Sequence, residues 1–299
     1  MKIIQTIKNY FKKENLYLDI YKIPGAINLD TNVCFSNKNT YPKFQERLEE
    51  YKSFLKKIFL DKRSYTFYKF GDGDYFFLKK KPNGSAEPKK RALSLNYNEI
   101  NHKLFMEGAH MCDFYSCEIY PENKKMFNKI FNKKKIDYPA EFNYGLISNK
   151  WIFHEFKGKI GLIGAGPKIK IIQQLMLNKK YQKYLGLDRF EDYVSIPQKY
   201  ACDNINLTEK IVAEQLKKSS SRIFLMGIGH VKSALIHRLP NYRNAIYLDV
   251  GSGIDALAGM IDIYRPFFGD WTNFRFKDET LYDEIDYLGY SKRGKHIYI

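Results

Sequence analysis

The sequence contains none of the patterns that mark membrane-spanning, secreted or disulfide-stabilised proteins. No stretch approaches about 18 uninterrupted apolar residues, so no transmembrane helix is expected. Residues 1–10 lack the long apolar run and the small-residue cleavage site of a secretory signal. The four cysteines form no CxxC pair, and Cys112 and Cys117 stand in a C-x4-C spacing without a histidine-rich second half. We therefore expect neither a zinc knuckle nor a disulfide scaffold, but reduced thiols in a cytoplasmic protein.

What the sequence has in excess is positive charge. Its 299 residues include 50 Lys and Arg against 33 Asp and Glu, a formal net charge of +17. A field of this sign attracts polyanions such as nucleic acid, an anionic lipid surface or phosphate-bearing substrates. Much of the excess is lysine in short clusters, and a solvated lysine surface without a specific partner explains these clusters equally well. Apolar residues make up 44% of the chain, which is enough for an ordinary core.

Residues 1–60 are expected to form a basic, helical N-terminal extension. Residues 3–11 place isoleucine and phenylalanine side chains on one stripe of a helix, with lysines around it. Such a helix either docks on the rest of the protein or lies on an anionic membrane, and docking is the simpler interpretation. Helical spacing returns over residues 41–60, which predicts a second helix that faces the core.

Residues 61–299 are expected to form one domain in which strands and helices alternate. Strands are predicted at residues 65–70, 160–163, 193–196, 223–226 and 245–250. A succession of strand, glycine turn, helix and strand is typical of βαβ units on a parallel sheet. The expected fold class is therefore α/β, with a Rossmann-like, mostly parallel sheet flanked by helices.

Three of the expected strands end in glycine turns, at residues 164–166, 227–229 and 251–253. At the carboxyl ends of parallel strands, helix N-termini present unpaired N–H groups to anions, and glycine permits close approach of a phosphate. The first turn lacks the last glycine of G-x-G-x-x-G, so a plain βα turn is favoured there over a nicotinamide site. The second turn suits phosphate better, because a lysine and a serine follow it. The predicted phosphate contacts are Gly227, Gly229, His230 and Lys232, and a βα turn with a surface lysine is the alternative.

The most specific pattern is Lys69-Phe-Gly71-Asp72-Gly73-Asp74, at the end of the first expected strand. Two carboxylates one residue apart, each next to a glycine, can converge on one divalent cation. Mg²⁺ and Mn²⁺ prefer oxygen ligands and are often held by one or two carboxylates together with phosphate oxygens. Such a metal neutralises a diphosphate leaving group. The spacing alone favours an Asp-Gly turn with incidental acids.

With a later segment, this pattern resembles the DUF1792 family of glycosyltransferases, whose fold is called GT-D. In that family a strand ends in Arg-(Phe/Tyr)-Gly-Asp-Gly-Glu, and an Asp-x-Glu motif serves metal and nucleotide diphosphate on a Rossmann-like sheet. Residues 245–251, Ala-Ile-Tyr-Leu-Asp-Val-Gly, resemble the family's Ala-Ile-Asp-Ile-Gly-His-x-Asp segment, with Asp255 as the counterpart of the trailing Asp. Three departures stand out: Asp74 replaces Glu, Lys69 replaces Arg, and the histidine after the glycine is absent.

The resemblance implies a metal-dependent glycosyltransferase whose nucleotide-diphosphate sugar donor is expected to be a UDP-hexose. Mn²⁺ or Mg²⁺ would be held by Asp72 and Asp74. Lys69, Gly71, Gly73 and the turn at residues 227–232 would surround the phosphates, and Asp255 or Asp249 would act as the general base. The implied acceptor is a glycan or a lipid-linked group, which would place the enzyme at the inner membrane face, in peripheral contact with anionic lipid.

Two rival functions stay open at this stage. A nucleic-acid-binding protein is suggested by the net charge and by the 16% aromatic content, because interleaved lysines and aromatic rings track a phosphodiester and stack bases. Most of the aromatic residues follow helix or strand periodicity, which fits a core, and no known binding motif occurs, so no specific nucleic acid is expected. A Rossmann methyltransferase, with Asp249 or the turn at residues 164–166 meeting its cofactor, is the more distant rival because the glycine pattern is incomplete.

Overall fold

The computed structural model describes residues 44–79, 99–118, 121–132, 134–197, 204–261, 268, 271–285 and 295–299. The helix expected at residues 3–11 lies outside them. The second expected helix is confirmed as α3 (Phe44–Leu60), and its apolar stripe, including Leu48, Tyr51 and Leu55, is buried. These side chains belong to the same hydrophobic cluster as residues of the central strands, so α3 packs on the sheet.

The centre of the protein is a seven-stranded sheet with the order β3-β2-β1-β7-β6-β4-β5, and every strand pair is parallel. Its strands are β1 (Tyr65–Phe70), β2 (Phe114–Cys117), β3 (Tyr138–Pro139), β4 (Ile160–Ala165), β5 (Asp192–Ile196), β6 (Ile223–Gly227) and β7 (Ile246–Asp249). The predicted Rossmann-like α/β fold is confirmed. The strands β2 and β3 were not among those predicted, and β3, with two residues, is too short to produce a periodicity.

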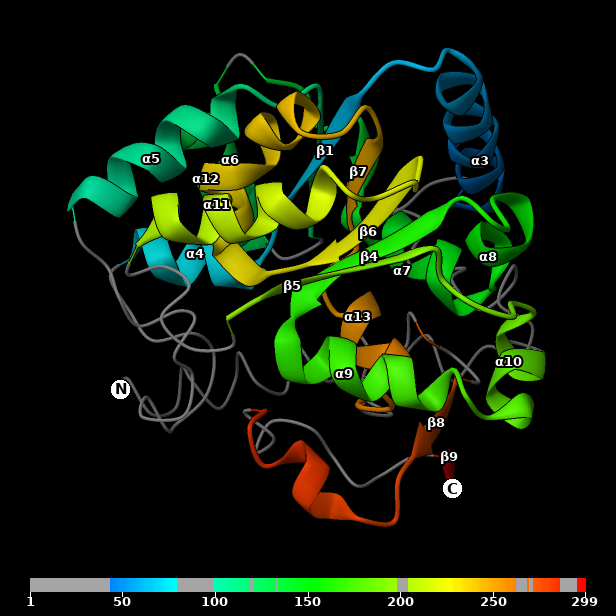
Figure 1. The fold of residues 1–299 in the computed structure, drawn as a ribbon. Helices are drawn as coiled ribbons and strands as arrows, with labels where there is room; N and C mark the ends of the chain where they lie inside the picture. Colours follow the sequence, from blue (N-terminus) through cyan, green and yellow to red (C-terminus); the bar gives the residue numbers. More distant parts are fainter. Residues whose placement is uncertain are drawn as a thin grey trace, which may run out of the picture.

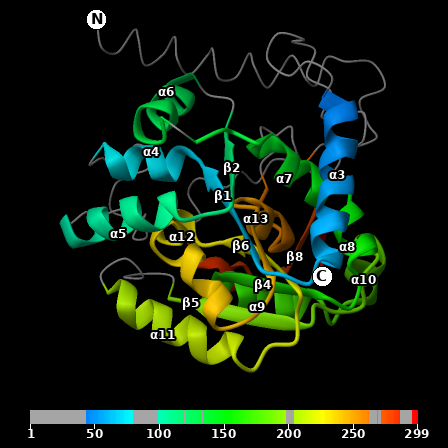
Figure 2. The same ribbon diagram turned by 90° about the horizontal axis from the view of Figure 1, so that it is seen from above.

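Helices cover both faces of the sheet, as Figures 1 and 2 show. Connections that run toward β3 carry α4 (Asp72–Leu78), α5 (Glu99–His110), α6 (Pro121–Ile130), α11 (Ile205–Leu216) and α12 (Lys232–Leu235). Connections that run toward β5 carry α7 (Ala140–Ser148), α8 (Trp151–Glu155) and α9 (Gly166–Leu175). The two sets lie on opposite faces because parallel crossovers are right-handed, so reversing the direction of travel moves the helix to the other face.

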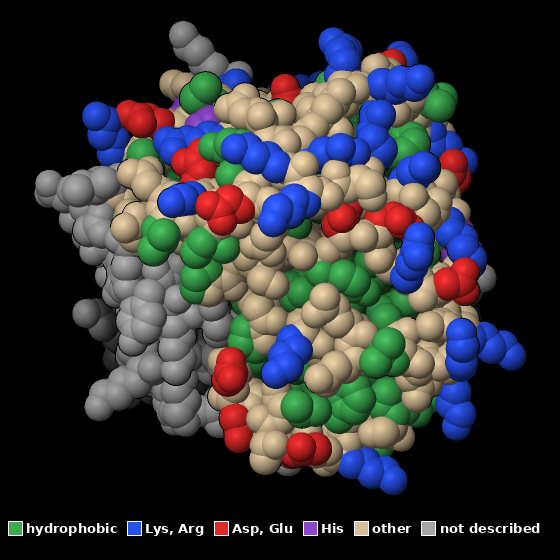
Figure 3. All heavy atoms as spheres, viewed as in Figure 1, with side chains coloured by type: hydrophobic (Ala, Val, Ile, Leu, Met, Phe, Trp, Pro, Cys, Tyr) green, Lys and Arg blue, Asp and Glu red, His purple; other side chains and the backbone are tan. Residues whose placement is uncertain are grey.

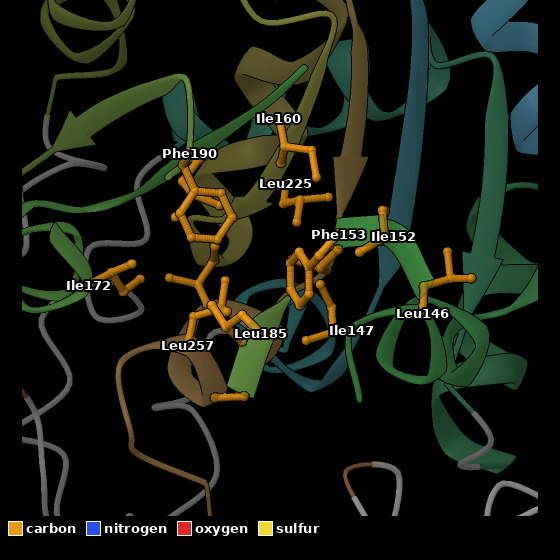
Figure 4. Close-up of a cluster of buried hydrophobic side chains, with 14 of the residues drawn as sticks. Leu146, Ile147, Ile152, Phe153, Ile160, Ile172, Leu185, Phe190, Leu225 and Leu257 are labelled. Atoms are coloured by element: carbon orange, nitrogen blue, oxygen red, sulfur yellow. The ribbon is translucent and has the colours of Figure 1, made fainter. Parts of the chain in front are cut away.

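Each face of the sheet has its own hydrophobic cluster. Along β1, Phe67 joins the cluster of α3 and α7, whereas its neighbours Tyr68 and Phe70 join that of α5 and α6. Figure 4 shows how side chains from α7, α8 and α9 meet those of the strands β4 and β6. Full burial of a side chain of this size contributes about 1.5–3 kcal/mol, so the two clusters hold the strand ends in fixed positions.

A small parallel sheet of β8 (Thr272–Arg275) and β9 (Lys295–Tyr298) lies beyond the central one. It packs through Phe274 against Tyr181 and Tyr184 of α10 (Lys179–Leu185). In the part of the chain that is described, no helix has the length and apolar character needed to cross a membrane. Cys112 and Cys117 are buried free thiols, and the other two cysteines lie outside the described residues.

Candidate functional site

Four neighbouring strands of the sheet end in glycine turns. In sheet order, β1, β7, β6 and β4 end in or lead into residues 71–73, 251–253, 227–229 and 164–166, which we call the carboxyl-edge turns. Gly227 is the last residue of β6. Gly164 and Ala165 are the last two of β4, so the turn expected at residues 164–166 is the direct junction of β4 with α9. After β7 the chain enters α13 (Gly253–Leu257), in the cluster that contains α9, whereas α4 and α12 follow β1 and β6 on the other face. Open α/β sheets bind ligands beyond the carboxyl ends of neighbouring strands whose following helices lie on opposite faces of the sheet. The fold thus brings the predicted turns to one candidate site.

The backbone of two carboxyl-edge turns closes around the side chain of Lys69. A Cβ atom on Gly71 would lie 2.8 Å from Lys69 Nζ, and one on Gly251 would lie 2.9 Å from Lys69 Cε. Gly251 also has a φ of +48°, in the left-handed region that disfavours side chains. The position of Gly251 therefore requires glycine, and a side chain at Gly71 would displace the Lys69 ammonium.

Lys69 is held by a buried acidic residue that the sequence pattern did not reveal. Its Nζ donates to Glu118 Oε1 at 3.1 Å, and the hydroxyl of Tyr144 donates to the same oxygen at 2.9 Å. Asn123 Nδ2 donates to Glu118 Oε2 at 3.3 Å. Burial acts to lower the pKa of Lys69, but the Glu118 carboxylate raises it well above its ordinary value. Lys69 is thus a fixed, charged ammonium at the end of β1.

Asp74 is fully buried, with 0% exposure, and each of its oxygens has a protein partner. Its Oδ2 accepts from the N–H of Gly71 at 2.9 Å and from Lys232 Nζ at 2.8 Å, while its Oδ1 accepts from Ser233 Oγ at 3.1 Å. The contact with Gly71 caps the first turn of α4, and the contact with Lys232 joins α4 to α12.

These contacts do not fit the metal ligand that the sequence led us to expect at Asp74. The Lys232 ammonium, 2.8 Å from the Asp74 carboxylate, lies where a metal ion would have to bind and repels such an ion. No group of three His, Cys, Asp or Glu side chains arranged for a metal occurs among the described residues. The side chain of the other predicted ligand, Asp72, lies outside what the structure describes.

Asp249, one of the two predicted general bases, shares Lys232 with Asp74. Its Oδ2 lies 3.2 Å from Lys232 Nζ, outside hydrogen-bonding geometry, and its Oδ1 accepts from the N–H of Gly251 at 3.0 Å. Burial raises the pKa of Asp249, which Lys232 and Lys69 counteract only in part. Burial acts to lower the pKa of Lys232, but the two carboxylates raise it overall. Lys232, predicted to contact phosphate, is thus 4% exposed and bridges two acids.

His230 also lies inside the protein rather than at its surface. Its ring stacks on Phe77 of α4 with centroids 4.5 Å apart, and burial lowers its pKa to about 4. The preceding Gly229 is exposed, has a φ of +59° and would leave a Cβ in open space. Gly73 is half-buried and Gly71 is buried. Of the predicted contacts in the turn after β6, Gly227 is half-buried and Gly229 alone is exposed.

Of the charged pairs described at the carboxyl edge, Lys168–Asp255 lies nearest to solvent. Lys168 Nζ donates to Asp255 Oδ1 at 2.5 Å, and the two side chains are 13% and 12% exposed. Lys168 lies in the first turn of α9, whose N-cap, Ala165, supplies no side-chain hydrogen bond. Asp255, the other predicted base, thus lies beside a lysine from a different turn. The position of Lys168 just after Gly166-Pro167 was the only sequence signal for its part in the site.

Comparisons with models of protein families, with curated proteins and with solved structures find no match for this chain. The fold and the geometry of the carboxyl edge therefore carry the functional argument.

Proposed function

We propose that the protein is a glycosyltransferase that binds the diphosphate of a nucleotide-sugar donor at the carboxyl edge. The observation that supports this most strongly is the alignment of four glycine turns on four neighbouring strands, with Lys168 and Asp255 as the partly exposed charges. The geometry supports the phosphate part of the proposal. The sugar part rests on the resemblance of residues 69–74 and 245–255 to the DUF1792 glycosyltransferases, and a UDP-hexose remains the expected donor.

The diphosphate would be held by the first turn of α9 and by Lys168. This ten-residue helix has no acidic residue in its first turn and no side-chain cap. Pro167 has no N–H, so the remaining N–H groups of the first turn and the helix dipole favour an anion. Gly166 and Gly229 let the phosphates approach the backbone. No step is assigned to the expected Mn²⁺ or Mg²⁺, because Lys232 already engages Asp74.

Asp255 is the base that this arrangement favours. When a phosphate draws the Lys168 ammonium away, the Asp255 carboxylate becomes available to accept the proton of an acceptor hydroxyl. In an inverting reaction the acceptor oxygen then forms a bond to the anomeric carbon, and the bond from that carbon to the diphosphate breaks. The negative charge that leaves with the nucleoside diphosphate would be stabilised by Lys168 and the N–H groups of α9. A glycan or lipid-linked hydroxyl is the proposed acceptor.

Replacing Lys168 by methionine is expected to weaken nucleotide binding by about 10- to 100-fold, because one charge-assisted hydrogen bond to phosphate is lost. Isothermal titration with UDP, and with CDP, GDP and dTDP in parallel, measures the change. UDP-sugar turnover is followed by UDP release.

Lys170→Met is the matched control, since Lys170 lies two residues further along α9 and is exposed. Equal affinity in both variants, or no binding of any nucleoside diphosphate by the unaltered protein, would contradict the proposal.

A further inference from the structure

The amino edge, where the strands begin, is basic before all but one of six consecutive strands, the exception being β2, which Met-Cys-Asp precedes. Six consecutive strands of the sheet, from β3 to β4, are preceded by residues 134–137, 111–113, 61–64, 243–245, 217–222 and 157–159. These segments contain ten Lys or Arg residues and three Asp residues. Because neighbouring strands lie about 4.8 Å apart, the six entry points span about 24 Å. Residues distant in the sequence thus meet in one basic row.

The acidic residues of this row are turned to the protein itself. Asp113 Oδ2 accepts from the backbone N–H and the hydroxyl of Thr66, both at 2.8 Å, and Asp137 Oδ2 accepts from the N–H of Tyr115 at 3.1 Å. The third, Asp61, accepts from the hydroxyl of Tyr65 at 3.1 Å. These hydrogen bonds tie the carboxylates to β1 and β2, and among the described residues Asp61 also pairs with one cation of the row, Arg63, at 3.6 Å.

Four of the lysines, in contrast, point to solvent, whereas Lys157 pairs with Asp188 at 2.9 Å. Lys62, Lys135, Lys159 and Lys218 are all exposed, and no carboxylate lies within ion-pair distance of them in the described part of the chain. Lys and Arg side chains are prominent in the upper part of Figure 3, including the upper right, where Figure 1 places the loop from α3 to β1. The negative ends of the neighbouring helix dipoles favour cations here, which accounts for lysine near helix ends.

Two large apolar side chains are exposed among these cations. Leu60, just before residues 61–64, is 75% exposed, and Met111, at the entrance to β2, is 66% exposed. Because β1 and β2 are neighbours, both lie at the same part of the amino edge. Helix dipoles do not account for exposed leucine and methionine, and apolar side chains make no favourable contact with a charged phosphodiester backbone. A lipid surface accounts for both kinds of side chain, because apolar side chains enter the boundary between headgroups and acyl chains while lysines contact the anionic headgroups.

We propose that the amino edge is a docking surface for an anionic lipid membrane. Leu60 and Met111 enter the interface, and the basic row contacts acidic headgroups around them. The six-residue strands β1 and β4 are about 20 Å long, so the carboxyl edge lies at the opposite end of the sheet from this surface. Of the two acceptors proposed above, this orientation favours the glycan, which reaches the site from the aqueous side, over the lipid-linked hydroxyl.

Co-sedimentation of the full-length protein with vesicles tests the proposal. The protein is expected to bind vesicles of phosphatidylcholine in which about one lipid in three is phosphatidylserine. This binding is expected to weaken steeply as the salt concentration rises. Lys159→Glu combined with Lys218→Glu is expected to reduce vesicle partitioning by at least about 30-fold, because each basic residue near an anionic surface contributes roughly fivefold. Leu60→Ser combined with Met111→Ser is expected to reduce vesicle partitioning as well, and to do so even at a salt concentration that already weakens the electrostatic part of the binding.

Lys125→Glu combined with Lys210→Glu is the matched control. It changes the net charge equally at two exposed lysines on α6 and α11, outside the six segments, and is expected to keep most of the binding. An equal loss of vesicle binding in the two charge-reversed proteins would show that binding depends only on the net charge of the protein, and would overturn the proposal. Binding to RNA or DNA at physiological salt, with no binding to the acidic vesicles, would overturn it in favour of a nucleic-acid partner.

Discussion

Replacing Lys232 by methionine is expected to lower the free energy of unfolding by about 3–5 kcal/mol. The ammonium lies 2.8 Å from Asp74 and 3.2 Å from Asp249, and both carboxylates are buried. Methionine matches the length of the lysine stem, but it leaves the buried Asp74 carboxylate without its cation and Asp249 with the charge of Lys69 alone. Urea denaturation of the two proteins at neutral pH measures the difference.

A second substitution separates the loss of charge balance from a simple packing defect. Adding Asp74→Asn to Lys232→Met removes one unpaired carboxylate and is expected to restore part of the lost stability. Lys210→Met, at an exposed position of α11, is expected to change the free energy by less than about 0.5 kcal/mol. A loss below about 1 kcal/mol for Lys232→Met would contradict the buried bridge between α4, α12 and β7.

The stability of the protein is expected to fall steeply as the pH drops from about 6.5 toward 4, with His230 as a principal cause. Burial lowers the pKa of His230 to about 4, below the ordinary value of about 6.5 that it regains on unfolding. The unfolded chain therefore binds the proton more tightly, so the stabilisation is complete above pH 6.5 and is lost as the pH falls through 4. The shift of roughly 2.5 pH units corresponds to about 3 kcal/mol.

His230→Phe tests this assignment, because phenylalanine keeps a ring against Phe77 and cannot take up a proton. The variant is expected to lose about 2–3 kcal/mol less than the unaltered protein between pH 7.5 and 4.5, as measured by urea denaturation at each pH. Parallel curves for the two proteins would show that His230 does not titrate in this range.

The strands and turns were predictable because their signals are local. A run of β-prone apolar residues followed by glycine is contained in fewer than ten positions, and the runs at residues 65–70 and 223–226 became β1 and β6. Their order in the sheet was not predictable, because β1 pairs with β7, which lies about 180 residues further along the chain. The common edge of the four glycine turns depends on that order.

The contacts of individual side chains could not be predicted from local sequence patterns. Gly-Asp-Gly-Asp fits a metal-binding turn and a helix cap equally well, and the partner that decides between them for Asp74 is Lys232, 158 positions away. Likewise, the contact of Lys69 with Glu118 depends on the parallel register of β1 and β2, in which Phe70 lies beside Cys117. His230 was expected to face a phosphate because of its glycine neighbour, but Phe77 covers its ring.

Hydrogen–deuterium exchange in the presence of a nucleoside diphosphate tests most directly whether the carboxyl edge is the ligand site. With saturating UDP, or whichever of CDP, GDP and dTDP binds best, slower exchange is expected in residues 164–169, 227–232 and 251–255, with the amino-edge segments unchanged. Slower exchange confined to the segments that precede the strands, or no change at the carboxyl edge with any of these nucleotides at millimolar concentration, would contradict this account.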